Sequence, residues 1–285
     1  MTVLQAAVLA VVQAATEFLP VSSSAHLVLV RWLFGWQDPG LAFDVALHFG
    51  TLLALAAYFA RTWMRIIANG FGWRAGQAGA AGADRDLDRS PRLLWHLALA
   101  TLPAAVAGLL VQDIIETHLR SPLVIASMLV AVGVVLLRAD RHGARGGDLG
   151  SLSLLGCVVV GCAQAVALVP GTSRSGVTIA AGLLLGLRRD AAARLSFLLA
   201  MPVVLGASLK TGVETLVGSG PRGVEAAPLM VGIAVSAIVG YFVIAEFLRY
   251  LQASSLALFV YYRFGVGALV LALLAANGSP AGGGL

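Results

Sequence analysis

Long apolar segments separated by short polar loops dominate the chain. Six of these segments have the length, or nearly the length, that a helix needs to cross a bilayer, about 20 residues. They cover residues 41–60, 93–111, 122–137, 195–209, 226–248 and 256–275. The pattern predicts an all-α polytopic membrane protein with six transmembrane helices, built as a single membrane domain over residues 1–285.

Two further apolar segments are interrupted by polar residues. Residues 1–36 break at Pro20 and the serines that follow it, and residues 152–187 break at residues 170–176. After each break only about ten apolar residues follow, half of what a membrane-spanning helix needs. Two half-length helices around a polar break predict a re-entrant hairpin, which enters and leaves the membrane on one side.

The distribution of arginine supports these hairpins. Loops 61–92, 138–150, 188–194 and 249–255 carry most of the arginine, which places them in the cytoplasm by the positive-inside rule. Segment 152–187 connects two of these loops, so both stay inside only if the segment is re-entrant. The same reasoning places both termini, and the opening of the first hairpin, on the outer (periplasmic) side.

The two halves of the chain have the same order of elements in opposite orientation. Residues 1–139 and 152–276, approximately, each contain one hairpin followed by three spans, which predicts an inverted-topology repeat. Gln13 and Gln164 precede the two breaks by similar distances. Proteins with this architecture place their site near the bilayer midplane, where the broken elements meet.

Composition excludes other classes of protein. The chain is 59% hydrophobic and only 12% charged, whereas a soluble domain carries about 25% charged residues. The net charge of +5 comes from loop arginines, and no aromatic-rich basic patch accompanies them, so we predict no nucleic-acid partner. Cys157 and Cys162 fit no metal or redox motif and are interpreted as packing residues.

The first break is rich in chemical groups. Gln13 and Glu17 are four residues apart and therefore share one face of a helix. Glu17 suits a general base or a metal ligand, and His26, just after the break, suits a general acid or base. The break itself holds three consecutive hydroxyls, those of Ser22, Ser23 and Ser24.

The second break has the character of an anion site. Ser173, Arg174 and Ser175 open a half-length helix, and Thr178 follows one turn later. Free N–H groups at a helix N-terminus, together with hydroxyls and an arginine, bind anions. Two such N-termini facing each other would suit a phosphate or a diphosphate.

Structural interpretations of these residues are also open. Serines in membrane helices often only bond to backbone carbonyls, and Glu17 and Arg174 could form an ion pair that merely fixes the two hairpins. His48, midway along a span, is either a site residue or a packed neutral histidine, and we favour the second interpretation. Asp44, near the outer end of the same span, serves either the site or only the membrane interface.

The two breaks resemble the signature motifs of a known family. Residues 16–26 (TEFLPVSSSAH) and 170–178 (PGTSRSGVT) are similar to those of the undecaprenyl-diphosphate phosphatases, the integral-membrane bacitracin-resistance family. The resemblance extends over nearly the whole chain, including residues 196–202 and 263–264. It implies hydrolysis of undecaprenyl diphosphate to undecaprenyl phosphate and inorganic phosphate in the bacterial cytoplasmic (inner) membrane. This reaction recycles the lipid carrier of peptidoglycan synthesis and confers bacitracin resistance.

The resemblance also implies roles for individual residues. Arg174 would hold the diphosphate, Ser23 would attack the terminal phosphorus or position a water, and His26 would transfer the proton. A divalent metal, Mg²⁺ or Ca²⁺, would bind Glu17 and Gln13, although many members of the family have glutamate where this chain has Gln13. The implied substrate-binding residues are Ser22, Ser24, Ser173, Ser175 and Thr178.

A transporter is the competing interpretation. Inverted repeats with broken helices are also a transporter architecture, so transport or flipping of polyprenyl phosphate lipids would use the same features. In both interpretations the partners are a polyprenyl diphosphate or phosphate lipid and the surrounding membrane lipids. The sequence does not determine the oligomeric state, and a homodimer is one state compatible with it.

Overall fold

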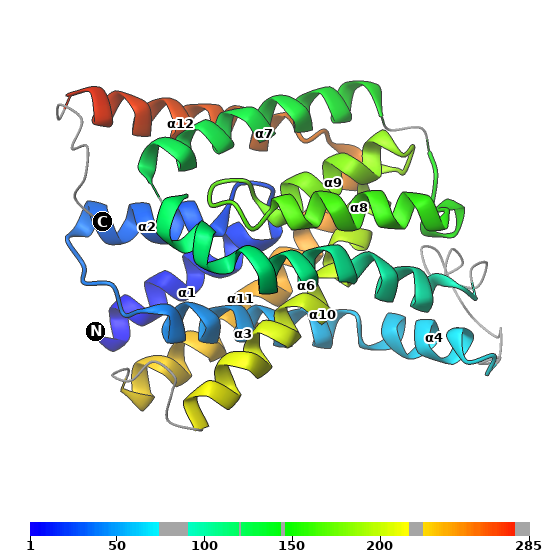
Figure 1. The fold of residues 1–285 in the computed structure, drawn as a ribbon, viewed down its shortest axis with the longest axis horizontal. Helices are drawn as coiled ribbons and strands as arrows, with labels where there is room; N and C mark the ends of the chain where they lie inside the picture. Colours follow the sequence, from blue (N-terminus) through cyan, green and yellow to red (C-terminus); the bar gives the residue numbers. More distant parts are fainter. Residues whose placement is uncertain (74–90, 120, 144–145, 217–224, 277–285) are drawn as a thin grey trace.

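The regular structure of the protein is helical. The computed structural model describes residues 1–73, 91–119, 121–143, 146–216 and 225–276. Within these ranges it contains eleven α-helices, a 3₁₀ helix (η2, Leu149–Ser151) and no strand, which confirms the predicted all-α class (Figure 1). Residues 74–90, most of the predicted loop 61–92, lie outside the described part of the chain.

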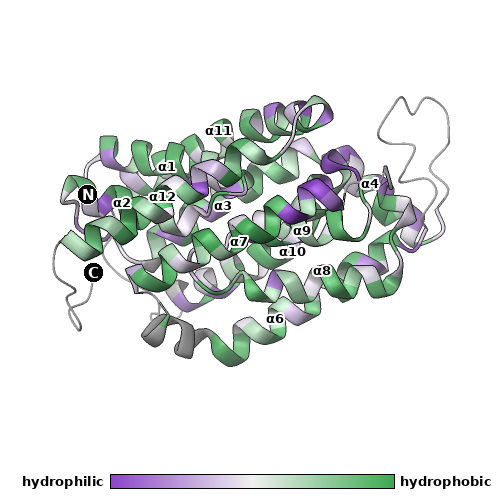
Figure 2. Ribbon diagram, turned by 90° about the horizontal axis from the view of Figure 1, so that it is seen from above, coloured by the Kyte–Doolittle hydropathy of each residue, from purple (hydrophilic) through white to green (hydrophobic). Residues whose placement is uncertain are grey.

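Among the described residues, five helices are long and apolar enough to cross a membrane. They are α6 (Leu93–His118), α7 (Pro122–His142), α10 (Arg189–Leu216), α11 (Ala226–Ala253) and α12 (Ala257–Ala276). A sixth candidate joins α3 (Leu41–Tyr58) to α4 (Ala60–Gly70), which are bent by 71° relative to each other. Hydrophobic residues cover most of these helices, and hydrophilic ones gather toward the end where α4 lies (Figure 2).

Several helices are longer than the apolar segments that predicted them. The helix α6 continues past residue 111, and α10 begins before residue 195 and ends after residue 209. A helix satisfies its own backbone hydrogen bonds, so it can extend beyond the apolar layer, where charged side chains reach toward water. Hydropathy therefore located these helices but not their ends.

Four shorter helices form the two broken segments. They are α1 (Val3–Phe18), α2 (Ser23–Phe34), α8 (Leu154–Val166) and α9 (Arg174–Leu184). In Figure 1, α1 and α8 approach the middle of the molecule from opposite ends. From there α2 runs back toward the end where α1 begins, and α9 runs back toward the end where α8 begins. The two breaks therefore meet near the centre.

The second broken segment returns to the end of the molecule from which it started. The amide of Gly147, before α8, donates a hydrogen bond to the carbonyl of Gly186, after α9 (2.9 Å). The amide of Arg188 in turn donates to the carbonyl of Gly147 (2.8 Å). The loops before and after this segment therefore lie side by side.

The tips of the two broken segments are the polar breaks between α1 and α2 and between α8 and α9, and they share an unusual backbone conformation. Ser22 has a φ of 77° and Ser173 a φ of 72°, and each residue occupies the N-cap position of the helix that follows. A non-glycine residue in this left-handed region costs about 1–3 kcal/mol. In both tips the hydroxyl of this serine lies 3.2 Å from that of the serine two residues later. The match is local evidence that the two segments are built alike.

Arg263, on α12, holds both tips. Its side chain is fully buried, and its guanidinium donates only to backbone carbonyls. In the tips, the acceptors are the carbonyls of Pro20, Gly171 and Thr172 (3.1 Å each). In α7, they are the carbonyls of Leu129 (3.1 Å) and Met128 (3.2 Å). In the sequence, Arg263 was noted only as part of the resemblance. An arginine inside an apolar span is itself a sign of a functional or structural role, and this sign could have identified it.

Candidate active site

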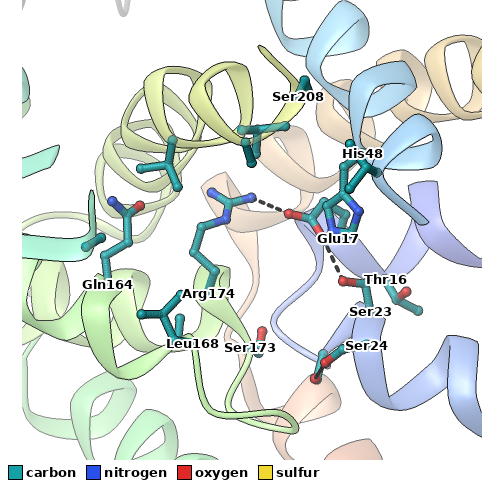
Figure 3. A pocket seen from close by; sticks show the side chains of 17 residues that line it. Thr16, Glu17, Ser23, Ser24, His48, Gln164, Leu168, Ser173, Arg174 and Ser208 are labelled. Atoms are coloured by element: carbon teal, nitrogen blue, oxygen red, sulfur yellow. Dashed lines mark hydrogen bonds and ion pairs between the residues drawn. The ribbon is translucent and has the colours of Figure 1, made fainter. Parts of the chain in front are cut away.

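A cavity of about 310 Å³ lies where the two tips meet. Polar residues line it, among them Glu17, Ser22, Ser23, Ser24, Ser173 and Arg174. Apolar residues line it as well, among them Val45, Ala104, Leu168, Val203, Val204 and Ala207. Figure 3 shows side chains from both broken segments pointing toward this space. Such a cavity suits a ligand with a charged head and an apolar tail.

Hydrogen bonds from three side chains converge on Glu17. Its Oε1 accepts a hydrogen bond from Nη2 of Arg174 at 2.8 Å, across the two broken segments. Its Oε2 accepts from Oγ of Ser23 at 2.7 Å and from Nε2 of Gln13 at 3.2 Å. The carboxylate is thus oriented by donors from α1, α2 and α9 (Figure 3).

The Glu17–Arg174 ion pair both connects the two segments and faces the cavity. Arg174 is further fixed by donating from Nη1 to the carbonyl of Ser196 (3.0 Å). Its side chain keeps 13% exposure and that of Glu17 keeps 8%. A pair that served only to fix the hairpins would not need to line a cavity beside a hydroxyl, so the geometry favours a role in binding or catalysis.

The predicted hydroxyls divide into two groups. Ser22, Ser23, Ser24 and Ser173 line the cavity. Ser23, hydrogen-bonded to a carboxylate, has the arrangement of a nucleophile beside its base. Ser173 accepts from the amide of Gly176 (3.1 Å) and so caps α9.

The other two predicted substrate-binding hydroxyls are not among the lining residues. Ser175 donates to the carbonyl of Leu19 (3.0 Å) and thereby ties the second tip to the first. Thr178 is fully buried and donates to the carbonyl of Arg174 (2.7 Å), which supports the first turn of α9. The structure therefore places Ser175 and Thr178 behind the site, where they hold its walls.

His26 is also outside the cavity lining. Its Nδ1 lies 2.7 Å from the carbonyl of Ser22, which can only accept, so Nδ1 carries the proton and donates. Its Nε2 then accepts from the hydroxyl of Tyr262 (2.7 Å), against which the ring is stacked. With both nitrogens engaged, His26 stabilises the left-handed conformation at Ser22.

His48, rather than His26, is the histidine that lies beside Glu17. The expectation that it is packed away from the site is wrong, because His48 lines the cavity and its side chain is 34% exposed. Its Nδ1 donates to the carbonyl of Asp44 (2.7 Å), which leaves Nε2 facing Oε2 of Glu17 at 3.5 Å (Figure 3). The carboxylate of Asp44 instead pairs with Arg31 at 3.2 Å, away from the cavity lining.

The donor set for a metal is smaller than the resemblance implies. Glu17 is the only carboxylate among the residues lining this cavity, and the described residues contain no cluster of three or more His, Cys, Asp and Glu. Gln13 is fully buried, does not line the cavity and directs its Nε2 toward Glu17. Mg²⁺ is commonly held by one or two carboxylates together with substrate phosphates, so Glu17 fits such an ion but Gln13 does not.

Known proteins resemble the chain over almost its full length. The family model described as "Bacitracin resistance protein BacA" matches residues 6–269. A protein of Trichlorobacter lovleyi named undecaprenyl-diphosphatase is 47% identical over 279 residues, which are 96% of this chain and 98% of the relative. One of the same name from Gemmatimonas aurantiaca is 46% identical over 277 residues, 97% of this chain and 100% of the relative. The chain therefore belongs to the bacitracin resistance protein BacA family.

Proposed function

We propose that the chain is an undecaprenyl-diphosphatase of the bacterial inner membrane. It hydrolyses undecaprenyl diphosphate to undecaprenyl phosphate and inorganic phosphate, which recycles the lipid carrier of peptidoglycan synthesis and confers bacitracin resistance. One observation carries the proposal: Glu17 accepts hydrogen bonds from Ser23 of one broken segment and from Arg174 of the other, at a cavity lined by both polar and apolar residues. The names of the relatives agree with it and give no support to a transporter.

The cavity accounts for both parts of such a substrate. Arg174 and the N-termini of α2 and α9 bind the diphosphate, because each presents donors to an anion. Val203, Val204 and Ala207 of α10 line the cavity with apolar surface and contact the first isoprene units. The rest of the tail extends into the bilayer between the spans.

The chemistry uses the contact between Ser23 and Glu17. Oγ of Ser23 attacks the terminal phosphorus, its proton passes to Glu17, and the bond from that phosphorus to the bridging oxygen breaks to release undecaprenyl phosphate. Water then hydrolyses the phosphoserine and releases inorganic phosphate. In the alternative, Ser23 positions a water that attacks directly. In both routes Arg174 stabilises the negative charge on the phosphoryl oxygens.

Proton transfer is assigned to Glu17 rather than to His26, whose two ring nitrogens are occupied. A Mg²⁺ or Ca²⁺ ion held by Glu17 and the substrate would supply Lewis-acid stabilisation of the phosphoryl group. The residues of the chain bind and orient the diphosphate.

The finer topology is part of the proposal. Six spans and two re-entrant hairpins form an inverted repeat, with both termini and the opening of the first hairpin on the periplasmic side. Three features support it: the opposed directions of α1 and α8, the return of segment 152–187 to its starting end, and the matched backbone of Ser22 and Ser173. Cysteines introduced one at a time at residues 2 and 68, in a variant whose Cys157 and Cys162 are replaced by serine, test it by labelling, since they should react from opposite sides of the membrane.

Phosphate release in detergent tests the function, because transport cannot contribute where the membrane has no sides. Wild type should release phosphate from undecaprenyl diphosphate, whereas Arg174→Ala and Glu17→Ala should lose the activity while still purifying as folded protein. Arg249→Ala is a matched control, since Arg249 is exposed and pairs with Glu246 on the surface. Near wild-type activity in either site variant would overturn the site assignment, and an inactive wild type would overturn the enzyme itself.

A further inference from the structure

Gln164 is a buried polar side chain with no partner. It lies on α8, two residues before that helix ends, and is 2% exposed. Within the part of the chain that the structure describes, neither Nε2 nor Oε1 of its amide has a hydrogen-bond partner. Buried amides are almost always hydrogen-bonded. Such a group on a cavity wall indicates that a ligand completes its hydrogen bonding.

Comparison with Gln13 shows why the amide of Gln164 is free. Both glutamines lie shortly before the tips of their segments. Gln13 donates to Glu17, which follows it by four residues. The residue four positions after Gln164 is Leu168, which offers no acceptor. The second segment therefore keeps the glutamine but lacks the carboxylate that would engage it.

The surroundings of Gln164 favour an anion. Its side chain lines the same cavity as Arg174 and Ser173, and Figure 3 shows its amide and the guanidinium of Arg174 directed toward the same side of the cavity. Arg174 brings a positive charge to this wall, while the carboxylate of Glu17 is held on the opposite side of the guanidinium. An amide N–H beside an arginine would add a donor for the oxygen atoms that the arginine binds.

We propose that Gln164 is a substrate-binding residue whose Nε2 donates a hydrogen bond to a phosphoryl oxygen of the diphosphate. Its Oε1 accepts from a water of the same site. The assignment rests on the proposed phosphatase function and deepens it. It adds Gln164 to Arg174 and the N-terminus of α9 among the groups of the second broken segment that bind the diphosphate, while the first segment also supplies Ser23 and Glu17 for the chemistry.

Affinity for a diphosphate that cannot be hydrolysed tests this contact. The probe is farnesyl methylenediphosphonate, titrated against purified protein in detergent at fixed Mg²⁺. Gln164→Leu should raise its Kd roughly tenfold, the loss expected for one hydrogen bond to a charged group. Gln164→Glu should raise it further, because a carboxylate would face the diphosphate. In phosphate release, the Leu variant should show its defect mainly in KM.

Stability separates binding from a structural role. Removing an amide that has no partner in the protein should leave the melting temperature of Gln164→Leu equal to or above that of wild type. Gln252→Leu, the same change at an exposed glutamine of α11, is the matched control and should bind the probe as wild type does.

The outcomes are distinct. Unchanged affinity in Gln164→Leu, or tighter binding by Gln164→Glu, would refute the contact, and the second result would indicate a cation site instead. A lowered melting temperature with unchanged affinity would make Gln164 a packing residue. If wild type released no phosphate, the phosphatase function would fail, while binding of the probe would still decide the role of Gln164.

Discussion

Replacing Arg263 by methionine should loosen both tips of the site at once. Arg263 supplies hydrogen bonds to the carbonyls of Pro20, Gly171 and Thr172, which lie outside the helices. Leaving a buried carbonyl unpaired destabilises the folded state by about 1–3 kcal/mol. Removing a buried charge offsets part of this loss, because the desolvation penalty of that charge, several kcal/mol, is no longer incurred. We therefore expect Arg263→Met to lower the free energy of unfolding by about 2–4 kcal/mol.

The effect on activity should exceed the effect on stability. The tips carry Ser23 and Arg174 on the helices that follow them, and small displacements of catalytic groups can cost about a hundredfold in rate. Arg263→Met should therefore reduce kcat by about that factor at temperatures where the variant is still folded. Arg263→Lys keeps the charge but cannot reach all five carbonyls. Its kcat and its stability should therefore lie between those of wild type and those of Arg263→Met.

The assay combines phosphate release in detergent with thermal unfolding of the same samples. The expected loss of stability corresponds to a melting temperature lower by about 5–10 °C. Arg249→Met, at the exposed arginine of α11, controls for loss of a positive charge. If Arg263→Met had the melting temperature and kcat of wild type, the idea that this residue holds the two tips would be refuted.

Three further predictions concern the surroundings of Glu17. His48→Phe should lower kcat about tenfold with little change in melting temperature, because His48 faces Glu17 from the cavity wall; unchanged kinetics would remove it from the site. Tyr262→Phe should lower the free energy of unfolding by about 1 kcal/mol and kcat by less than threefold, since it removes one hydrogen bond to His26. A loss of activity as large as that of Glu17→Ala would instead indicate that His26 takes part in catalysis. Chelation by EDTA should abolish phosphate release and added Mg²⁺ or Ca²⁺ should restore it, whereas activity that persists after chelation would exclude a metal requirement.

Much of the fold could be predicted because hydropathy and helix length are local properties. The all-α class, the apolar helices and the two polar breaks followed from the cost of placing polar residues in an apolar segment. The ion pair between Glu17 and Arg174 was only one of the alternatives left open. The ends of α6 and α10 did not follow, because a helix can continue beyond the apolar layer.

The allocation of roles within the site depended on tertiary contacts. His26 and His48 are both histidines in apolar surroundings. The ring of His26 is hydrogen-bonded at both nitrogens, but one of its partners is Tyr262, more than 200 residues away in the chain, so the sequence alone does not distinguish the two. Ser175 and Thr178 belong to the same motif as Arg174 but point at backbone carbonyls. A motif therefore identified the segment that forms the site, whereas the direction of each side chain could not be read from it.

The position of Arg263 has a consequence for biogenesis. The two tips belong to the first and second halves of the chain, but the arginine that holds them lies on α12, the last helix described. During synthesis both tips enter the membrane before their shared donor is made, so the site stays incomplete until α12 is inserted. A nascent or truncated chain that ends before residue 257 would hold the reactive groups without the donor that fixes them, and insertion of this helix would be the step that activates the enzyme.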